Sequence, residues 1–237
     1  MATLEIRGLV RKFDYFRALD SIDLDLSRGE LLTVFGPNGA GKTTLIRLLS
    51  TQLRPSEGTI TVDGHDLVQH RRDVRRHIGL ISHDTFLYPT LTAAENLSFY
   101  GRLYDVKNLK DRVDEMLQLV ELADRRSSQV STFSRGMEQR LCIARALLHE
   151  PQIVLLDEPY TGLDQHAARM LTETLKKLVS RNRAVLMVTH NLGRGLDIAS
   201  RVAVLVKGNI VFDKSADEVE SADFEQRYFE YVEGGAS

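Results

Sequence analysis

A glycine-rich loop at residues 36–43 carries the clearest chemistry of this chain. It reads Gly-Pro-Asn-Gly-Ala-Gly-Lys-Thr, the pattern G-x-x-x-x-G-K-[ST] of a phosphate-binding loop. Glycines let backbone N–H groups converge on phosphate oxygens, while Lys42 reaches the β- and γ-phosphates and the Thr43 hydroxyl binds Mg²⁺. We therefore expect a nucleoside triphosphate here, bound by Gly36, Pro37, Asn38, Gly39, Ala40, Gly41, Lys42, Thr43 and Thr44.

A pair of carboxylates supplies the second part of this chemistry. Residues 153–156 are apolar and predict a buried strand, and Asp157 and Glu158 follow it directly. In this position Asp157 would hold Mg²⁺, through water, and Glu158 would act as general base or orient the attacking water. Acidic residues after a strand are common in ordinary loops, but together with the phosphate loop they favour triphosphate hydrolysis.

The phosphate loop needs a strand before it and a helix after it, and the sequence predicts both. Residues 31–35 form a short apolar, β-rich run. Residues 43–49 have a helix-like composition, with Leu45, Leu48 and Leu49 on one side. A helix that starts at the loop directs the positive end of its dipole at the phosphates.

The rest of the chain predicts an α/β fold whose parallel sheet is interrupted by a helical insert. Strands are expected at 22–26, 58–64, 78–82, 152–157, 184–189 and 202–206, and a helix near 165–180. Between residues 90 and 130 the pattern changes to helices. We therefore expect one domain, divided into an ATP-binding core (4–89 and 131–212), a helical insert (90–130) and a C-terminal helical tail (213–237).

Several helix starts carry capping residues. Thr92 and Glu95 form a capping box, and Asn108 and Ser134 stand where the following helices begin. The arginines of residues 71–76 are interpreted as a solvated face. In the tail, aromatic side chains alternate with charged ones and predict a helix docked on its own domain: Phe224, Tyr228, Phe229 and Tyr231.

The bulk composition limits the classes of function. The 237 residues include 31 basic and 33 acidic ones, so no overall basic field favours nucleic acid. The one cysteine, Cys142, forms no internal disulfide, which suits a reducing cytoplasm, and is expected to fill the core. We find no signal peptide and no apolar run of about 18 residues, so a membrane role requires a separate partner.

Residues 133–140 resemble the signature of the ATP-binding-cassette family, L-S-G-G-Q followed by x-Q-R. Ser134, Gly136, Gln139 and Arg140 match this signature. Three positions depart from it: Phe133 for Leu, Arg135 for the first Gly and Met137 for Gln. The resemblance covers residues 4–212, because the other family motifs occur in order and at suitable distances.

The resemblance implies roles for residues outside the phosphate loop. Asp164 lies in a segment similar to the family's D-loop, near the dimer interface, and His190 looks like the switch histidine that contacts the γ-phosphate or the attacking water. Phe13 occupies the aromatic position that stacks on adenine, with Tyr15 as a near competitor. Ser134 and Gly136 would contact the nucleotide held by a second subunit.

Two departures from the family pattern affect this interpretation. Where the family places a Gln that ligates Mg²⁺ and senses the transmembrane partner, this chain has His83 and Asp84. We favour His83 by register, while Asp84 would be the harder Mg²⁺ ligand. At the first glycine position of the signature, Arg135 either adds positive charge or points outward, and the second interpretation is the safer one.

As a whole, the resemblance implies a P-loop NTPase core with a parallel sheet, an N-terminal antiparallel β subdomain and an inserted α-helical subdomain. Its expected activity is hydrolysis of ATP with Mg²⁺. ATP would close a head-to-tail homodimer or heterodimer, which would power separate transmembrane subunits at the cytoplasmic face of the cell membrane. A regulatory cassette without ATPase activity is disfavoured because Lys42, Asp157, Glu158 and His190 are all present.

Three interpretations concern the process that ATP hydrolysis drives. Residues 82–88, 95–97 and 133–137 look like the bacterial haem-exporter group of cytochrome c maturation. A multidrug- or polysaccharide-type exporter is the alternative, since substrate specificity would reside in the membrane subunits. A soluble cassette ATPase acting on nucleic acid or the ribosome is the rival class, but such proteins usually carry two fused cassettes, long coiled coils or basic extensions.

Overall fold

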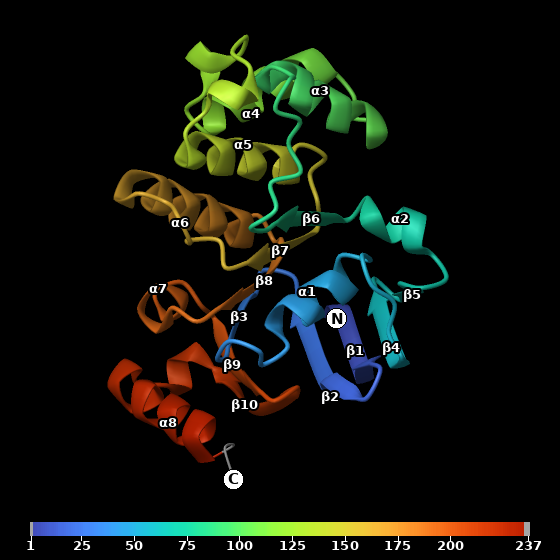
Figure 1. The fold of residues 1–237 in the computed structure, drawn as a ribbon, viewed down its shortest axis with the longest axis vertical. Helices are drawn as coiled ribbons and strands as arrows, with labels where there is room; N and C mark the ends of the chain where they lie inside the picture. Colours follow the sequence, from blue (N-terminus) through green and yellow to red (C-terminus); the bar gives the residue numbers. More distant parts are fainter. Residues whose placement is uncertain (1, 235–237) are drawn as a thin grey trace.

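The computed structural model describes residues 2–234 and contains two sheets (Figure 1). One is antiparallel, in the order β2-β1-β4-β5, and consists of β1 (Ala2–Phe13), β2 (Phe16–Ser27), β4 (Glu57–Val62) and β5 (His65–Asp66). The other has the order β10-β9-β3-β8-β7-β6, with β3 (Leu31–Phe35), β6 (Ile78–Ile81), β7 (Ile153–Asp157), β8 (Ala184–Thr189), β9 (Arg201–Val206) and β10 (Asn209–Ser215).

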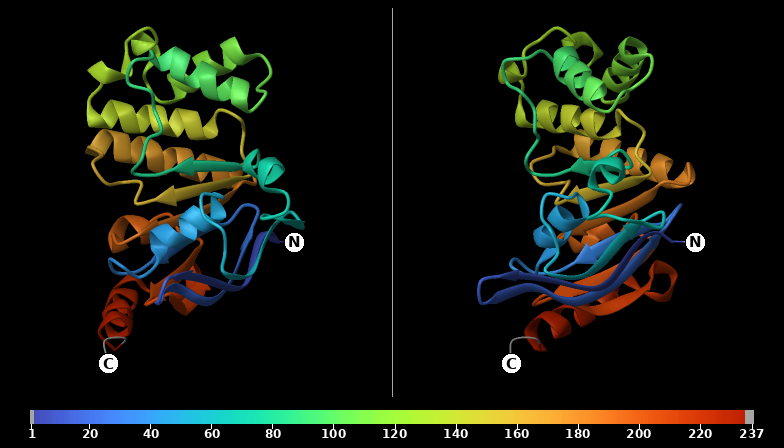
Figure 2. Two further views of the ribbon diagram at one scale, coloured as in Figure 1. Left: turned by 45° about the vertical axis from the view of Figure 1, so that its right-hand side comes forward. Right: turned by 90° about the vertical axis from the view of Figure 1, so that its right-hand side faces the viewer.

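The helices cover the faces and one end of these sheets (Figure 2). They are α1 (Lys42–Leu49), α2 (Arg71–Arg75), α3 (Ala93–Leu103), α4 (Leu109–Leu119), α5 (Arg135–Leu147), α6 (Gln165–Ser180), α7 (Leu192–Leu196) and α8 (Ser221–Gly234). Short 3₁₀ turns occupy Ala123–Arg125, Val130–Thr132 and Ala216–Glu218. The predicted strands and helices of the core are confirmed, with ends that shift by a few residues.

The larger sheet positions the site because its central strands are parallel and end at one edge. β3 pairs with β8 and β9, and β7 pairs with β8 and β6, all in parallel register. Phe35 lies opposite Thr189, and Asp157 lies opposite Val188. Both faces of β3, β7 and β8 are covered, which explains their continuous apolar sequences. The segments that follow these strands therefore meet in space.

The antiparallel sheet and α1 share one core with the parallel sheet. On β2 the alternation predicted from sequence is confirmed, since Ile22, Leu24 and Leu26 are buried. α1 packs against β7, β8 and β2, with Leu45 and Leu48 fully buried. The phosphate loop is thus held between a strand and a helix that both belong to the core.

The helical insert lies at the far end of the molecule from α8 and packs on α5 (Figure 2). Its capping box is confirmed: the Thr92 hydroxyl accepts from the Glu95 N–H at 3.2 Å, and Glu95 accepts from the Thr92 N–H at 2.8 Å. The Asn108 cap is wrong. Asn108 has a left-handed backbone (φ 48°) and its side chain makes no capping hydrogen bond, because capping requires an extended N-cap residue.

The arginines between 71 and 76 do more than form a solvated face. Arg71 and Arg75 both donate to Thr51, just beyond the C-terminus of α1, and Arg76 pairs with Asp105 at 2.6 Å. Arg72, Arg75 and Arg76 are exposed, as predicted, and the contacts with Thr51 add a structural role that the sequence did not reveal because Thr51 is distant along the chain. The cluster therefore ties α2 to the helix of the phosphate loop.

The C-terminal helix packs on its own domain, as predicted. Phe224 is 1% exposed, and its ring lies 5.3 Å from that of Phe35 and 5.7 Å from that of Phe212. Tyr228 is buried as well, whereas Phe229 is 49% exposed. Phe35 precedes the phosphate loop, so α8 supports this loop from behind.

Candidate functional site

The predicted catalytic groups lie around two adjoining pockets at the carboxyl edge of the parallel sheet, and the first of these pockets contains Glu158 and His190. The volume of this first pocket is about 480 Å³. Residues from the phosphate loop, from α1 and from the ends of β6, β7 and β8 form its wall: Asn38, Thr43, Arg47, Ser82, His83, Asp84, Asp157, Glu158 and His190 among others. A neighbouring pocket of about 310 Å³ is lined by the rest of the phosphate loop, including Lys42.

The phosphate loop can be built only with glycine at two of its positions. A Cβ on Gly36 would lie 2.3 Å from the carbonyl oxygen of Leu205. Gly41 has φ 110°, and its Cβ would lie 2.5 Å from the carbonyl oxygen of Ala18. These glycines therefore let the backbone of the loop turn closely against β9 and β2.

Lys42 is a largely buried cation held by the loop itself. Its Nζ donates to the carbonyl oxygens of Gly36 at 2.6 Å and Pro37 at 3.1 Å, and lies 3.7 Å from Glu158 Oε1. Burial lowers the pKa of Lys42, while the carboxylates of Glu158 and Asp157 oppose that shift. Burial removes water from this ammonium group, and phosphate oxygens would provide charged partners in place of that water.

Asp157 and Thr43 offer adjacent oxygen atoms that fit a magnesium ion. The Thr43 hydroxyl donates to Asp157 Oδ1 at 3.3 Å. Burial raises the pKa of Asp157, so this carboxylate gains from a nearby cation. Within residues 2–234 no group of three or more His, Cys, Asp or Glu side chains is arranged to hold a metal. Mg²⁺ usually binds one or two protein oxygens together with phosphate oxygens and water, and the pair Thr43 and Asp157 fits that pattern.

The carboxylate of Glu158 contacts three groups from two segments, the end of β8 and the phosphate loop. Its Oε1 accepts from His190 Nδ1 at 2.8 Å, its Oε2 accepts from the Thr189 hydroxyl at 2.9 Å, and Lys42 Nζ lies nearby. The backbone of Glu158 is left-handed (φ 50°), a strained conformation for a residue with a side chain. The N–H of Glu158 donates to the carbonyl oxygen of Val188 at 3.0 Å, which fixes this turn. The carboxylate is thus aimed at the phosphate loop.

The aromatic residues near the loop include one that sequence reasoning missed. Phe13 and Phe16 pair across the β1–β2 turn, and both line the pocket with residues 37–44. Tyr15, the predicted competitor of Phe13, is fully exposed and does not line this pocket. The guanidinium of Arg11 lies 4.4 Å over the Phe13 ring. Phe16 was missed because its place beside Phe13 depends on the register of the β1–β2 hairpin.

His83 and Asp84 follow β6 and form part of the wall of the 480 Å³ pocket. Both line the pocket with Thr43 and Asp157, and both are exposed. The Ser82 hydroxyl donates to the carbonyl oxygen of Asp84 at 2.8 Å and fixes the turn between them. The geometry therefore admits either side chain as the group that approaches the ion and the γ-phosphate.

The signature residues form a separate cluster. Ser134 caps α5 by accepting from the Met137 N–H at 3.3 Å, and Asp164 caps α6 by accepting from the Ala167 N–H at 2.8 Å. A Cβ on Gly136 would lie 3.9 Å from Asp164 Oδ2, so the two helix starts are neighbours. None of Ser134, Gly136 and Asp164 lines either pocket around the phosphate loop.

Arg135 stands at the start of α5, within this separate cluster. Its guanidinium carbon lies 3.8 Å from the Cβ position of Gly162, which has φ 79°. The side chain is exposed and rests on the segment between Glu158 and Asp164. A bulky residue at Gly162 would therefore have to displace this guanidinium.

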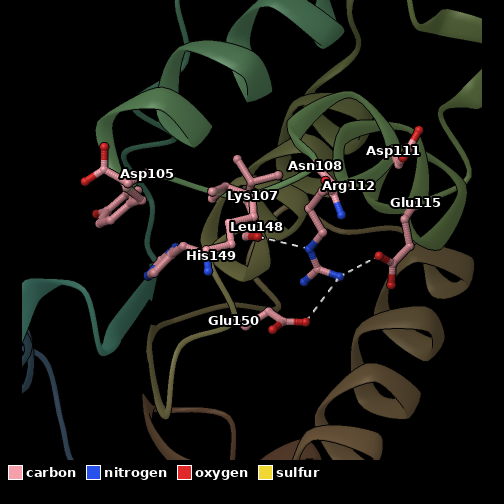
Figure 3. Close-up of a pocket in the computed structure, with 11 residues that line it drawn as sticks. Asp105, Lys107, Asn108, Asp111, Arg112, Glu115, Leu148, His149 and Glu150 are labelled. Carbon is pink, nitrogen blue, oxygen red and sulfur yellow. Dashed lines mark hydrogen bonds and ion pairs between the residues drawn. The ribbon is translucent and has the colours of Figure 1, made fainter.

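Another pocket, of about 520 Å³, lies between the helical insert and the C-terminus of α5 (Figure 3). Arg112 donates to the carbonyl oxygens of Leu148 at 3.0 Å and Leu147 at 2.9 Å and pairs with Glu115 at 2.7 Å. These contacts satisfy carbonyl groups at the end of α5. No predicted site residue lines this pocket.

Comparison with known proteins identifies the family. The model of the ABC transporter family matches residues 19–161. The chain belongs to this family. It is 38% identical to the daunorubicin resistance ATP-binding protein DrrA3 of Streptomyces coeruleorubidus over 92% of this chain and 70% of that protein. It is also 38% identical to the sulfate/thiosulfate import ATP-binding protein CysA of Rhodopseudomonas palustris, over 88% of this chain and 62% of that protein.

Solved structures show the same fold. An ATP-binding subunit of an ABC transporter superposes with a TM-score of 0.86 at 28% identity, covering 91% of each chain. An ATP-binding cassette in a dimeric post-hydrolysis state, bound to ADP and Pi, superposes with a TM-score of 0.81 at 26% identity, covering 90% of this chain and 98% of that one. The expected P-loop fold with parallel and antiparallel sheets is confirmed.

Together these observations make this chain the ATP-binding subunit of an ABC transporter, in a family whose members hydrolyse ATP. One of the two relatives named above is named for drug resistance and the other for import, so family membership leaves the direction of transport open. Within the described part of the chain, no helix combines the length and the apolar character needed to cross a bilayer.

Proposed function

We propose that Mg²⁺ and ATP bind at the carboxyl edge of the parallel sheet. The phosphates would lie on backbone N–H groups of the phosphate loop and the start of α1, with Lys42 exchanging its carbonyl partners for the β- and γ-phosphates. Adenine would stack on the free face of Phe13, beside Phe16. Thr43 and Asp157 would hold Mg²⁺ with either His83 or Asp84 nearby, and the ion would neutralise charge on the phosphates.

Glu158 would orient the attacking water or accept its proton. Its contacts with His190 and Thr189 keep the carboxylate beside Lys42, where the terminal phosphate is expected. His190 would then contact the γ-phosphate while its other ring nitrogen holds Glu158. The observation that carries this proposal is the place of Glu158 between Lys42 and His190: its Oε1 lies 3.7 Å from Lys42 Nζ and accepts from His190 Nδ1 at 2.8 Å.

We further propose that the hydrolytic site is completed by a second subunit. Ser134, Gly136 and Asp164 lie outside the phosphate-loop pockets of their own chain. Two neighbouring helix starts present N–H groups and positive potential there, which suits a γ-phosphate held by a facing chain. A related cassette has been solved as a dimer with ADP and Pi. The second subunit would be another copy of this chain or a related ATP-binding subunit.

The motion of this dimer would be used by a membrane partner. Exposed aromatic residues at the junction between the helical insert and the core, Phe86, Tyr88 and Phe99, offer a contact for separate transmembrane subunits. The chain would then work as a peripheral protein at the cytoplasmic face of the membrane. We propose an exporter, because several relatives are named for drug resistance or Nod factor export.

Two classes of compound are candidates for the exported substrate. Planar lipophilic drugs are favoured by the similarity to DrrA3, and haem by the resemblance of residues 82–88, 95–97 and 133–137. The test is ATPase activity of the chain copurified with its membrane subunits, measured with daunorubicin and with haem. Stimulation by one compound identifies the substrate class, and stimulation by sulfate alone would contradict export.

The nucleotide site itself is tested by binding of a fluorescent ATP analogue. Lys42→Ala should weaken binding by about 100-fold, because it removes a buried cation from the phosphates. Lys207→Ala is the matched control, since Lys207 is exposed and lines neither pocket. Equal affinity in wild type and Lys42→Ala would place the nucleotide elsewhere.

A further inference from the structure

Arg145, on α5, is a buried cation whose partners are neutral. The residue is 8% exposed. Its guanidinium donates to the carbonyl oxygen of Leu80 at 2.8 Å and to Cys142 Sγ at 3.5 Å, and its Nε has no hydrogen-bond partner in the described part of the chain. Burial of a cation without a carboxylate is unfavourable, so a purely space-filling role would be served better by an apolar side chain.

Two aromatic rings complete the surroundings of Arg145. Its guanidinium lies 5.4 Å from the ring centre of Phe86 and 5.3 Å from that of Tyr100. Leu80 belongs to β6, Phe86 to the loop that follows it, and Tyr100 to α3 of the helical insert. One side chain of α5 therefore contacts the core sheet, the loop after β6 and the helical insert.

The loop that Arg145 contacts is strained and leads to the nucleotide pocket. Phe86 has a left-handed backbone (φ 55°), which is unfavourable for an aromatic residue. The Tyr100 hydroxyl donates to the carbonyl oxygen of Phe86, so two groups hold this conformation. Leu80, His83, Asp84 and Phe86 all line the 480 Å³ pocket that Thr43 and Asp157 share.

We infer that Arg145 is a positioning residue for ATP hydrolysis, which holds Leu80 and Phe86 so that the His83–Asp84 turn faces the phosphates. The same contacts join this turn to α5, whose first residues would face the nucleotide of the second subunit. The inference rests on the nucleotide site proposed above. Arg145 itself lines neither pocket around the phosphate loop, so it acts through the loop and not on ATP.

Replacing Arg145 by a side chain of similar length distinguishes a positioning role from a role in packing alone. Arg145→Met should keep or raise the melting temperature, because it removes a buried cation that lacks a charged partner. Its kcat should fall by about 10-fold with a KM for ATP within about threefold of wild type, since the phosphate loop and Phe13 are unchanged. Arg145→Lys, which retains a charge and a donor, should recover at least half of the lost kcat on a logarithmic scale.

Two further variants make the result unambiguous. Tyr100→Phe removes only the hydroxyl that holds the Phe86 carbonyl, so its kcat should fall in the same direction as that of Arg145→Met. Arg112→Met is the matched control, because Arg112 also donates to carbonyl groups of α5 but lies away from the nucleotide pocket (Figure 3). It should lower the melting temperature and leave kcat within about twofold of wild type.

The experiment measures kcat, KM and melting temperature of the full chain. Wild-type kcat in folded Arg145→Met would overturn the inference. If that variant does not fold, wild-type kcat in Tyr100→Phe overturns it, and a reduced kcat at unchanged KM supports it. Failure of the nucleotide site is distinguished by Lys42→Ala: a variant that binds ATP normally refutes the site, whereas loss of binding with a normal Arg145→Met refutes the positioning role alone.

Discussion

Burial prepares the charged residues of the site for a charged ligand. It lowers the pKa of Lys42 and raises that of Asp157, so each group lacks part of the solvation that stabilises its charge. The carbonyl groups of the loop and the hydroxyl of Thr43 compensate only in part. Mg²⁺ and the phosphates would supply the missing countercharges, which makes binding of the two ligands mutually supportive.

Glu158 is the residue whose replacement separates binding from hydrolysis. Glu158→Gln keeps the size and the contacts with Thr189 but removes the carboxylate, so turnover should fall by about 1,000-fold while ATP affinity changes little. Phosphate release and nucleotide binding are measured on the same preparation. Glu115→Gln, on the exposed side of α4, should retain normal turnover. Normal turnover in Glu158→Gln would exclude Glu158 from the chemistry.

His149 makes stability sensitive to acid. Its Nε2 contacts the Ile78 carbonyl oxygen at 3.1 Å, its ring stacks on Tyr104 at 4.0 Å, and burial lowers its pKa to about 4. Since the unfolded value is near 6.5, acid protonates the unfolded chain first, and stability falls as the pH drops from 6.5 to 4. At pH 5 this group removes about 2 kcal/mol of unfolding free energy.

The contribution of His149 is measured by urea unfolding at pH 7 and pH 5. In His149→Gln the loss of stability between these two values should be smaller by about 2 kcal/mol than in wild type. His65→Gln, at an exposed position, should behave like wild type. An identical pH dependence in wild type and His149→Gln would show that His149 titrates normally in the folded chain.

At the scale of elements, α8 supports the phosphate loop through aromatic packing. Phe224 lies against Phe35, the last residue of β3, and both are fully buried. Phe224→Ala should therefore reduce the free energy of unfolding by about 3 kcal/mol, through lost burial and a cavity. Chemical denaturation measures this loss. Phe229→Ala, which truncates a half-exposed ring of the same helix, should cost under about 1 kcal/mol, and equal losses would contradict the docking of α8.

Local signals predicted elements better than they predicted long-range contacts. The capping box at Thr92 depends on residues three apart, so the sequence contains all of it. The predicted helix cap at Asn108 was wrong because the left-handed backbone of this residue follows from the turn between α3 and α4. Phe16 was missed because its position depends on the register of β1 and β2. Each failure concerns a conformation that neighbouring elements impose.

At the scale of the whole molecule, the candidate site likewise contains local motifs that the sequence predicts and long-range contacts that it does not. The phosphate loop and the pair Asp157–Glu158 were found from sequence because each motif is contiguous. The hydrogen bonds of Glu158 to His190 and Thr189 required the parallel pairing of β7 and β8. The role proposed for Arg145 depends on three elements that meet only in the folded chain.

The dimer hypothesis makes a prediction for pairs of defective subunits. Lys42→Ala removes the phosphate-loop half of a site, and Ser134→Arg blocks the half that begins at α5. Each variant alone should be nearly inactive, because every site of its dimer contains one defect. In a mixed dimer one site contains both defects and the other contains none.

Mixing these two variants is therefore the most direct test of a site shared between subunits. An equimolar mixture should recover about a quarter of wild-type ATPase activity if subunits exchange freely. Ser134→Arg must still bind ATP, which a fluorescent analogue establishes beforehand. Activity of the mixture that equals the average of the separate variants would contradict the shared site and place the complete reaction within one chain.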